Sequence, residues 1–228
     1  WLRELEPLFA VPDGSRHTIG LRYWGKHPIK DGTKVTREWD WDFEGAYQCG
    51  HDDDLLRVER SIEAGFVPGV VGHTWMVPWK PRLAGLFYWG SGDTDRFDDE
   101  TNTFSVLYPL GHAYWGIIDN LSGQNLLDYS IQGQLKPTEK LTANAQLHWF
   151  NLDTNQDRLY TVAGAGVGGT NGSVNVGQEL DLIGTYQFCA NFDVQAGYSW
   201  FWYGETINGS ALRRGDASQF YLQTTLRY

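Results

Sequence analysis

Apolar and polar residues alternate along most of this chain. Between positions 140 and 150 every second residue is apolar: Leu141, Ala143, Ala145, Leu147 and Trp149. The residues between them are polar. Because successive side chains of an extended chain point to opposite sides, this period of two predicts a β-strand with one apolar and one polar face.

The segment 37–49 shows the same alternation with charges on its polar side. Acidic residues occupy one side and aromatic residues the other, namely Glu38, Asp40, Asp42 and Glu44 against Trp39, Trp41, Phe43 and Tyr47. Burying unpaired carboxylates in a dry core costs much free energy. We therefore expect the acidic side of this strand to meet water.

Six further segments alternate in this way: 17–26, 81–93, 125–136, 177–188, 192–204 and 218–228. The region 55–77 is strand-like, and Pro68 and Gly69 mark either a bulge in one long strand or a turn between two strands. The pattern predicts nine or ten strands, with helix only as a short piece in the loop 102–124.

Short and long connections alternate between these strands. The short ones are 77–80, 136–140 and 189–193, and the long polar ones are 92–124, 151–176 and 205–217. This asymmetry is typical of barrels that cross the outer membrane, so the predicted fold class is all-β, an antiparallel transmembrane β-barrel. A soluble β-sandwich or jelly roll, whose strands also alternate, is the competing fold.

Aromatic residues gather toward the ends of the predicted strands. They are Tyr23, Trp24, Phe87, Trp89, Trp200, Trp202 and Tyr228. Such positions fit girdles at the two edges of a lipid-facing band. The last strand ends on Tyr228, which predicts a recognition strand for the barrel-assembly machinery.

Composition narrows the choice of fold. The 228 residues include 27 Gly and 15% aromatic residues, which disfavours a helical bundle, a coiled coil or a disordered chain. No apolar run is long enough for a transmembrane helix. The net charge of −10 disfavours nucleic-acid binding, which needs a basic face. Cys49 and Cys189 form no metal-binding motif with nearby residues.

Several ordered blocks of the chain resemble the C-terminal part of alginate-export family outer-membrane β-barrel proteins, especially the planctomycete-type version. The blocks are PWKPRL (78–83), YWGSGD (88–93), the stretch 102–126, VGQELDL (176–182) and YLQTTLRY (221–228). The resemblance begins near Trp39, and the stretch 102–126 is its most specific part.

The resemblance implies a barrel of about 18 strands that exports an anionic polysaccharide through a basic pore. Members of the family are about twice as long as this chain, which begins at Trp1 rather than Met. We therefore expect residues 1–228 to be a single barrel domain lacking N-terminal strands, in the outer membrane of a diderm bacterium. Closure as a smaller barrel is the alternative.

The polar strand faces supply the candidate pore-lining residues. They are Arg22, Lys26, Glu38, Asp40, Asp42, Glu44, Arg82, Asp128, Gln132, Lys136, Gln146, His148, Glu179, Asp181 and Arg227. Acids are in excess, which departs from the basic pore of the family. The bases could form a path for anions only if the acids pair with other bases. Opposed charges on neighbouring strands also commonly brace barrel walls, which is the alternative role of these residues. The charge favours small or cationic solutes over a polyanion.

Three loop features need separate interpretation. The acidic loop 90–103 holds weak metal candidates, Asp93, Asp95, Asp98 and Asp99, but their spacing lacks the EF-hand order and favours a solvated loop. The Gly-rich segment 162–177 lacks the Lys-Ser/Thr of a phosphate loop and is expected to be an outer loop. The apolar segment 108–119 is expected to fold into the lumen or cap it, or else to pack on the barrel rim.

Taken together, the sequence predicts a porin-like channel or exporter for polysaccharide or small hydrophilic solutes, with outer-membrane lipid as its surroundings. A structural or adhesive barrel with a plugged lumen is one alternative, and an outer-membrane enzyme is another. No cofactor and no catalytic residue are predicted, because His148 has no Ser at two-residue spacing and His112 has no obvious acid beside it.

Overall fold

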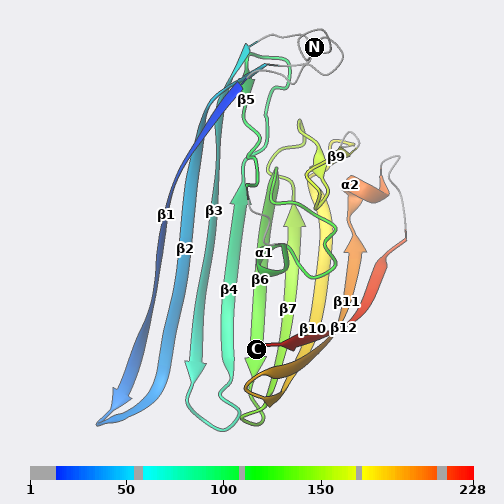
Figure 1. The fold of residues 1–228 in the computed structure, drawn as a ribbon. Coiled ribbons are helices and arrows are strands. Elements are labelled where there is room, and N and C mark those ends of the chain that lie inside the picture. The colour runs from blue at the N-terminus through cyan, green and yellow to red at the C-terminus, as the bar shows by residue number, and fades with distance from the viewer. Residues whose placement is uncertain (1–13, 54–58, 108–110, 168–170, 210–214) are drawn as a thin grey trace.

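One antiparallel sheet dominates the structure (Figure 1). The computed structural model describes residues 14–53, 59–107, 111–167, 171–209 and 215–228. Nine strands follow one another across the sheet: β1 (Gly14–Asp31), β2 (Lys34–Asp53), β3 (Glu59–Trp75), β4 (Arg82–Gly90), β6 (Leu126–Leu135), β7 (Leu141–Asn151), β10 (Asn175–Cys189), β11 (Phe192–Tyr203) and β12 (Ala217–Leu226). The prediction of an all-β, antiparallel fold is confirmed.

Smaller elements lie in the connections. The strand β5 (Glu100–Thr101) pairs in parallel with β3, and β8 (Leu159–Tyr160) pairs with β9 (Gly166–Val167). Two four-residue helices, α1 (Gly111–Tyr114) and α2 (Glu205–Asn208), lie in different long connections. The sequence predicted a short helix only where α1 lies. No helix in the described ranges is long and apolar enough to span a membrane.

The sheet is curved and open. In Figure 1 the strands from β10 onward bend round, so that β12 lies in front of the middle of the sheet. Within the described residues β1 is hydrogen-bonded only to β2, and β12 only to β11. These residues therefore form a curved wall with two edges.

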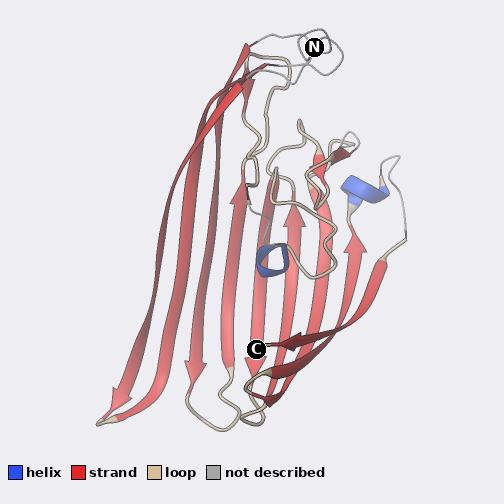
Figure 2. Cartoon of the chain, in the orientation of Figure 1, coloured by secondary structure: helices blue, strands red, loops and turns tan. Residues whose placement is uncertain are grey.

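The two ends of the wall differ in the length of their connections (Figure 2). At one end the turns are short, as at Gly32 with a φ of +60°, at 76–81, at 136–140 and at 190–191. The longer connections gather at the opposite end, which we call the loop end. The predicted alternation of short and long connections is confirmed.

The strand β3 settles the ambiguity at Pro68. It runs unbroken from Glu59 to Trp75, and its register with β2 and with β4 is unchanged on either side of this proline. Pro68 and Gly69 therefore mark neither a bulge nor a turn.

The two faces of the sheet differ sharply in chemistry. The convex face exposes large apolar side chains such as Ile19 (74% exposed), Leu21 (79%) and Phe220 (66%), with Ile131 and Leu182 also exposed. The concave face carries most of the charged and amide residues of the strands. Because the side-chain period of a strand is two, a one-residue slip of register would exchange these faces.

Trp24 lies on the concave face, as its alternation with Arg22 and Lys26 predicts. It does not belong to an outward girdle with Tyr23, because neighbouring residues of a strand point to opposite sides. Trp24 lies opposite Asp42 in the register of β1 and β2, and its ring centroid is 5.5 Å from the guanidinium carbon of Arg22. It therefore belongs to the charged concave face.

The hydrophobic core lies on the concave face toward the loop end. Tyr88, Phe150 and Phe201 come from the strands, and Trp115 and Ile207 come from the connections. The parallel rings of Phe150 and Phe201 have centroids 5.7 Å apart. Connections that fold onto the sheet supply five of the twelve buried residues of this core, namely Trp115, Leu121, Leu152, Leu159 and Ile207.

Replacing Phe150 with alanine is expected to destabilise the fold, because this side chain is completely buried. Large-to-small changes at such sites cost about 3–5 kcal/mol. Urea unfolding of the protein in detergent micelles measures the change. The matched control is Phe220→Ala on the convex face, which should cost less than about 1 kcal/mol. Equal losses for the two variants would contradict the assignment of the faces.

Candidate functional site

Ion pairs link the strands across the concave face. They join Arg22 Nε to Asp42 Oδ1 (2.8 Å), Lys26 Nζ to Glu38 Oε1 (3.2 Å) and Arg82 Nε to Asp40 Oδ2 (2.9 Å). Both arginines make a second hydrogen bond to the same carboxylate, so these pairs are bidentate. Arg22 and Lys26 are therefore neutralised by acids of the adjoining strand β2, and Arg82 on β4 reaches across β3 to an acid of β2.

The remaining predicted bases offer no continuous cationic path either. Arg227 Nη1 lies 2.7 Å from Asp193 Oδ2. Lys136 follows the end of β6 in a short turn, away from the middle of the face. Glu44 makes no ion pair within the described part of the chain, so the face keeps a negative excess. This pairing supports the bracing interpretation of the charges.

Asp128 and His148 form a buried pair on β6 and β7. Asp128 Oδ2 lies 2.7 Å from His148 Nδ1, and both side chains are almost wholly excluded from solvent. His148 Nε2 lies 3.2 Å from Gln146 Oε1. Ser130 faces His148 in the register, but its hydroxyl accepts a hydrogen bond from Gln132 instead. Both ring nitrogens are thus engaged, and the imidazole has no described serine to activate.

A second histidine pair corrects the sequence analysis. His112 was expected to have no acid beside it, yet His112 Nε2 lies 2.7 Å from Asp119 Oδ2. The residues are seven positions apart, and the turn around α1 brings them together. The prediction overlooked this pair because the loop conformation is not visible in a strand pattern.

The connection 102–125 folds onto the concave face, which agrees with the inward arrangement considered for 108–119; positions 108–110 lie outside the described residues. We call its segment 111–123 the inward loop. Glu179 on β10 holds it, because Glu179 Oε1 accepts hydrogen bonds from the backbone N–H groups of Ile117 (2.6 Å) and Ile118 (2.9 Å). Glu179 is completely buried as a result.

Gly116 makes this close approach possible. Its φ is +80°, a conformation that L side chains rarely adopt, and an added Cβ would lie 2.6 Å from the Glu179 carboxyl group. Gly123 plays a similar part, since a Cβ there would meet the Tyr88 hydroxyl and the Trp115 ring. The inward loop is therefore fitted closely to the wall.

The neighbouring acid Asp181 is completely buried beside Glu179. Neither of its carboxylate oxygens, nor the hydroxyl of Ser199 opposite it, has a hydrogen-bond partner among the described residues. Of the predicted pore-lining residues, Asp128, His148, Glu179 and Asp181 all lie on the concave face beneath or beside the inward loop. In the described ranges no three His, Cys, Asp or Glu residues are placed to hold a metal ion.

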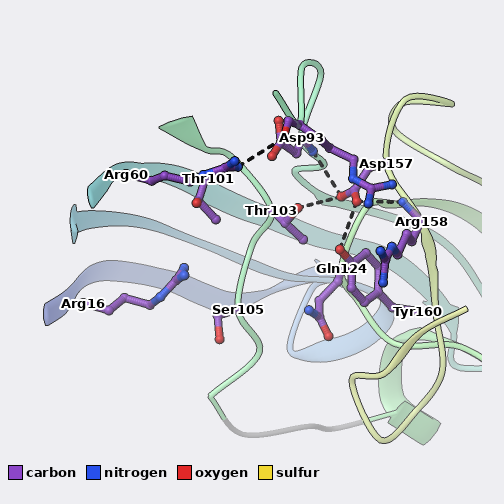
Figure 3. A pocket seen from close by; sticks show the side chains of 12 residues that line it. Arg16, Arg60, Asp93, Thr101, Thr103, Ser105, Gln124, Asp157, Arg158 and Tyr160 are labelled. Atoms are coloured by element: carbon purple, nitrogen blue, oxygen red, sulfur yellow. Dashed lines mark hydrogen bonds between the residues drawn. The ribbon is translucent and has the colours of Figure 1, made fainter. Parts of the chain in front are cut away.

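A basic pocket of about 500 Å³ lies at the loop end (Figure 3). Four arginines from distant parts of the chain line it, namely Arg16, Arg60, Arg96 and Arg158. Asp157 organises the opposite wall by accepting hydrogen bonds from the Thr103 hydroxyl (2.6 Å) and the Tyr160 hydroxyl (2.9 Å). Burial raises the pKa of Tyr160 to about 12. The sequence analysis did not find this pocket, because no motif links its arginines.

The acidic loop beside this pocket uses its carboxylates to form turns. Backbone N–H groups two residues on donate to Asp93 (3.1 Å), Asp95 (3.1 Å) and Asp98 (2.9 Å). Asp99, the fourth weak metal candidate, is exposed. Asp93 itself is 5% exposed, and burial, together with the charge of Asp157, raises the pKa of its carboxyl.

Replacing Gly116 with alanine is expected to release the inward loop. The strained φ alone costs about 1–2 kcal/mol, and contact with Glu179 adds to it. Hydrogen exchange at residues 111–118 should accelerate about tenfold or more, since 1.4 kcal/mol corresponds to a factor of ten. Gly184→Ala on the same strand as Glu179 meets nothing within 4 Å and should leave this exchange unchanged. Unchanged exchange in the Gly116 variant would refute the anchoring role.

Replacing Asp93 with asparagine is expected to stabilise the protein at neutral pH. Because the folded-state pKa of Asp93 is raised, the folded state binds this proton more tightly, and stability falls as the pH rises through the folded pKa. The variant should melt about 2 °C higher at pH 8, and the difference should vanish near pH 3. Exposed Asp99→Asn is the control, and an equal gain there would contradict the assignment.

The chain matches one known family over most of its length. The family described as alginate export matches residues 4–219. No match was found among curated proteins. The family match covers nearly the whole chain and confirms the resemblance carried by the sequence blocks. This chain, a curved antiparallel wall with an inward loop, therefore belongs to the alginate export family, whose role is transport.

Proposed function

We propose that this chain forms a β-barrel in the outer membrane of a diderm bacterium, with its concave face lining a conduit. The observation that carries the proposal is the chemistry of the two faces: exposed aliphatic and aromatic side chains on the convex side, and ion pairs with amides on the concave side. In lipid, backbone polar groups must be satisfied internally, which favours a closed ring of strands. We propose that residues 1–228 are one barrel domain and that β1 and β12 take part in closing it.

The proposed barrel would contact lipid and the machinery that assembles it. The convex face would contact lipid, with Tyr23, Trp89 and Trp202 near the edges of the apolar band. The strand β12 runs toward the short-turn end and carries exposed apolar residues, Phe220, Leu222 and Leu226. We propose that the barrel-assembly machinery recognises this strand.

The conduit would pass polysaccharide or small hydrophilic solutes passively. The polar side chains of the concave face would replace part of the water around a solute. The bases of this face are paired, and acids such as Glu44 make no ion pair with a described residue, which favours cations over anions. The inward loop would narrow the passage near the loop end.

A plugged structural barrel is the second candidate. The close fit of the inward loop, with Trp115 and Ile117 almost fully buried, favours it. Conductance across a planar lipid bilayer separates the two functions. We expect channels with a reversal potential that shows cation preference, and absence of conductance would support the plug. Clear anion preference would instead restore a polyanion path.

Cysteine labelling tests which face meets water. In a background with Cys49 and Cys189 changed to serine, Gln132→Cys should react with a membrane-impermeant thiol reagent, and conductance should fall several-fold because Gln132 lies on the concave face. Ile131→Cys, its neighbour on the convex face, is the control and should stay unlabelled in the membrane. Labelling of residue 131 alone would overturn the proposed orientation.

A further inference from the structure

A cavity of about 350 Å³ lies beneath the inward loop, between β6, β7 and β10. We call it the amide pocket, because five of its lining residues are amides, and two isoleucines contribute apolar surface: Gln132, Gln134, Asn144, Gln146 and Gln195, with Ile117 and Ile183. Gln195 already uses both ends of its amide, donating to the Thr185 hydroxyl and accepting from the Tyr221 hydroxyl. Its volume falls within the range of small-molecule sites, about 300–1,000 Å³. The strand register places Gln132 opposite Gln146 and Gln134 opposite Asn144.

The amides of the pocket keep hydrogen-bonding capacity of both kinds. Gln134 Nε2 donates to Asn144 Oδ1 (2.9 Å). The carbonyl oxygen of Gln134 and the amino group of Asn144 then have no partner among the described residues. Gln132 uses its amino group on Ser130, and Gln146 uses its carbonyl oxygen on His148. The pocket thus offers two acceptors and two amino groups. Hydroxyl groups, which both donate and accept, match this set.

Every cation that lines the pocket already has its own carboxylate. Arg82 is held bidentately by Asp40, and His112 lies 2.7 Å from Asp119. Asp181, buried and without a described partner, lies opposite Gln146 on the neighbouring strand. An anionic ligand would find no uncompensated positive charge here and would meet acceptor oxygens. The charge distribution favours an uncharged ligand.

The apolar part of the lining completes the match. Ile117 and Ile183 are nearly buried, and they come from the inward loop and from β10. A sugar ring presents hydroxyls at its edge and C–H groups on its faces, so amides and aliphatic side chains together suit it. We propose that the amide pocket binds one unit of an uncharged, hydroxyl-rich saccharide. This inference rests on the proposed conduit and names the class of solute that it selects.

Calorimetric titration of the full chain in detergent micelles tests the pocket directly. The probes are a neutral glucose hexamer, maltohexaose, and a uronate hexamer of equal length. We expect saturable binding of the neutral hexamer and at least tenfold weaker binding of the uronate hexamer. Equal or stronger binding of the uronate would overturn the proposal.

Variants locate the binding in this pocket. Changing Gln132 and Gln146 together to leucine removes an acceptor and an amino group and should weaken binding of the neutral hexamer at least tenfold. Gln178→Leu, an exposed amide that points away from the concave face, is the matched control and should bind as the native chain does. Where the double variant does not fold, Gln146→Leu alone should weaken binding several-fold. If a folded variant of either kind bound the neutral hexamer as the native chain does, the assignment of binding to the amide pocket would be wrong.

Bilayer recordings separate this inference from the conduit itself. The neutral hexamer should interrupt the current in native channels, and the leucine variants should conduct without interruption. A channel that conducts but binds neither hexamer would contradict saccharide binding in the amide pocket and would still support the proposed conduit. Binding in detergent without any conductance would support the pocket in a plugged barrel.

Discussion

The structure depends on one constraint: a pleated strand sends successive side chains to opposite sides. With apolar residues exposed over the convex face, the acidic residues that alternate with them, such as Asp40, Asp42 and Glu179, are placed on the other face. There they must find partners among themselves, because unpaired buried charges are costly. The diagonal pairs between β1, β2 and β4 are the direct result of this requirement.

The inward loop depends on the same wall. A segment buried against a sheet leaves backbone N–H groups that need acceptors. Glu179 accepts hydrogen bonds from the backbone N–H groups of Ile117 and Ile118. Earlier in the same connection, Gln48 both donates to and accepts from the backbone of Ser105. Acidic and amide residues that look like pore lining in the sequence are thus partly used to hold the loop.

The concave face consequently has regions of different chemistry. Toward the loop end it holds the aromatic core and the basic pocket, and beneath the inward loop it holds neutral amides. A solute that moved along this face would pass from the arginine-lined pocket to a neutral zone of amides that can form hydrogen bonds. Membership of the alginate export family fixes the role as transport, whereas these local differences bear on which solutes are transported.

The sequence by itself determined the strands and their faces. Each strand depends on a local period, as in the alternation from Leu141 to Trp149, and the short connections are equally local. The same alternation places Trp24 with Arg22 and Lys26, on the side opposite Tyr23. The apolar character of the segment 108–119 also indicated that this part of the loop would be buried.

Only the tertiary structure decided which residues meet. His148 is paired with Asp128 because β6 and β7 are neighbours in one particular register, and the arginines of the basic pocket lie together because distant segments converge. The physical reason is that a periodic pattern is a property of consecutive residues. Strand neighbours, register and loop docking instead depend on long-range hydrogen bonds and packing, which no local window of the sequence contains.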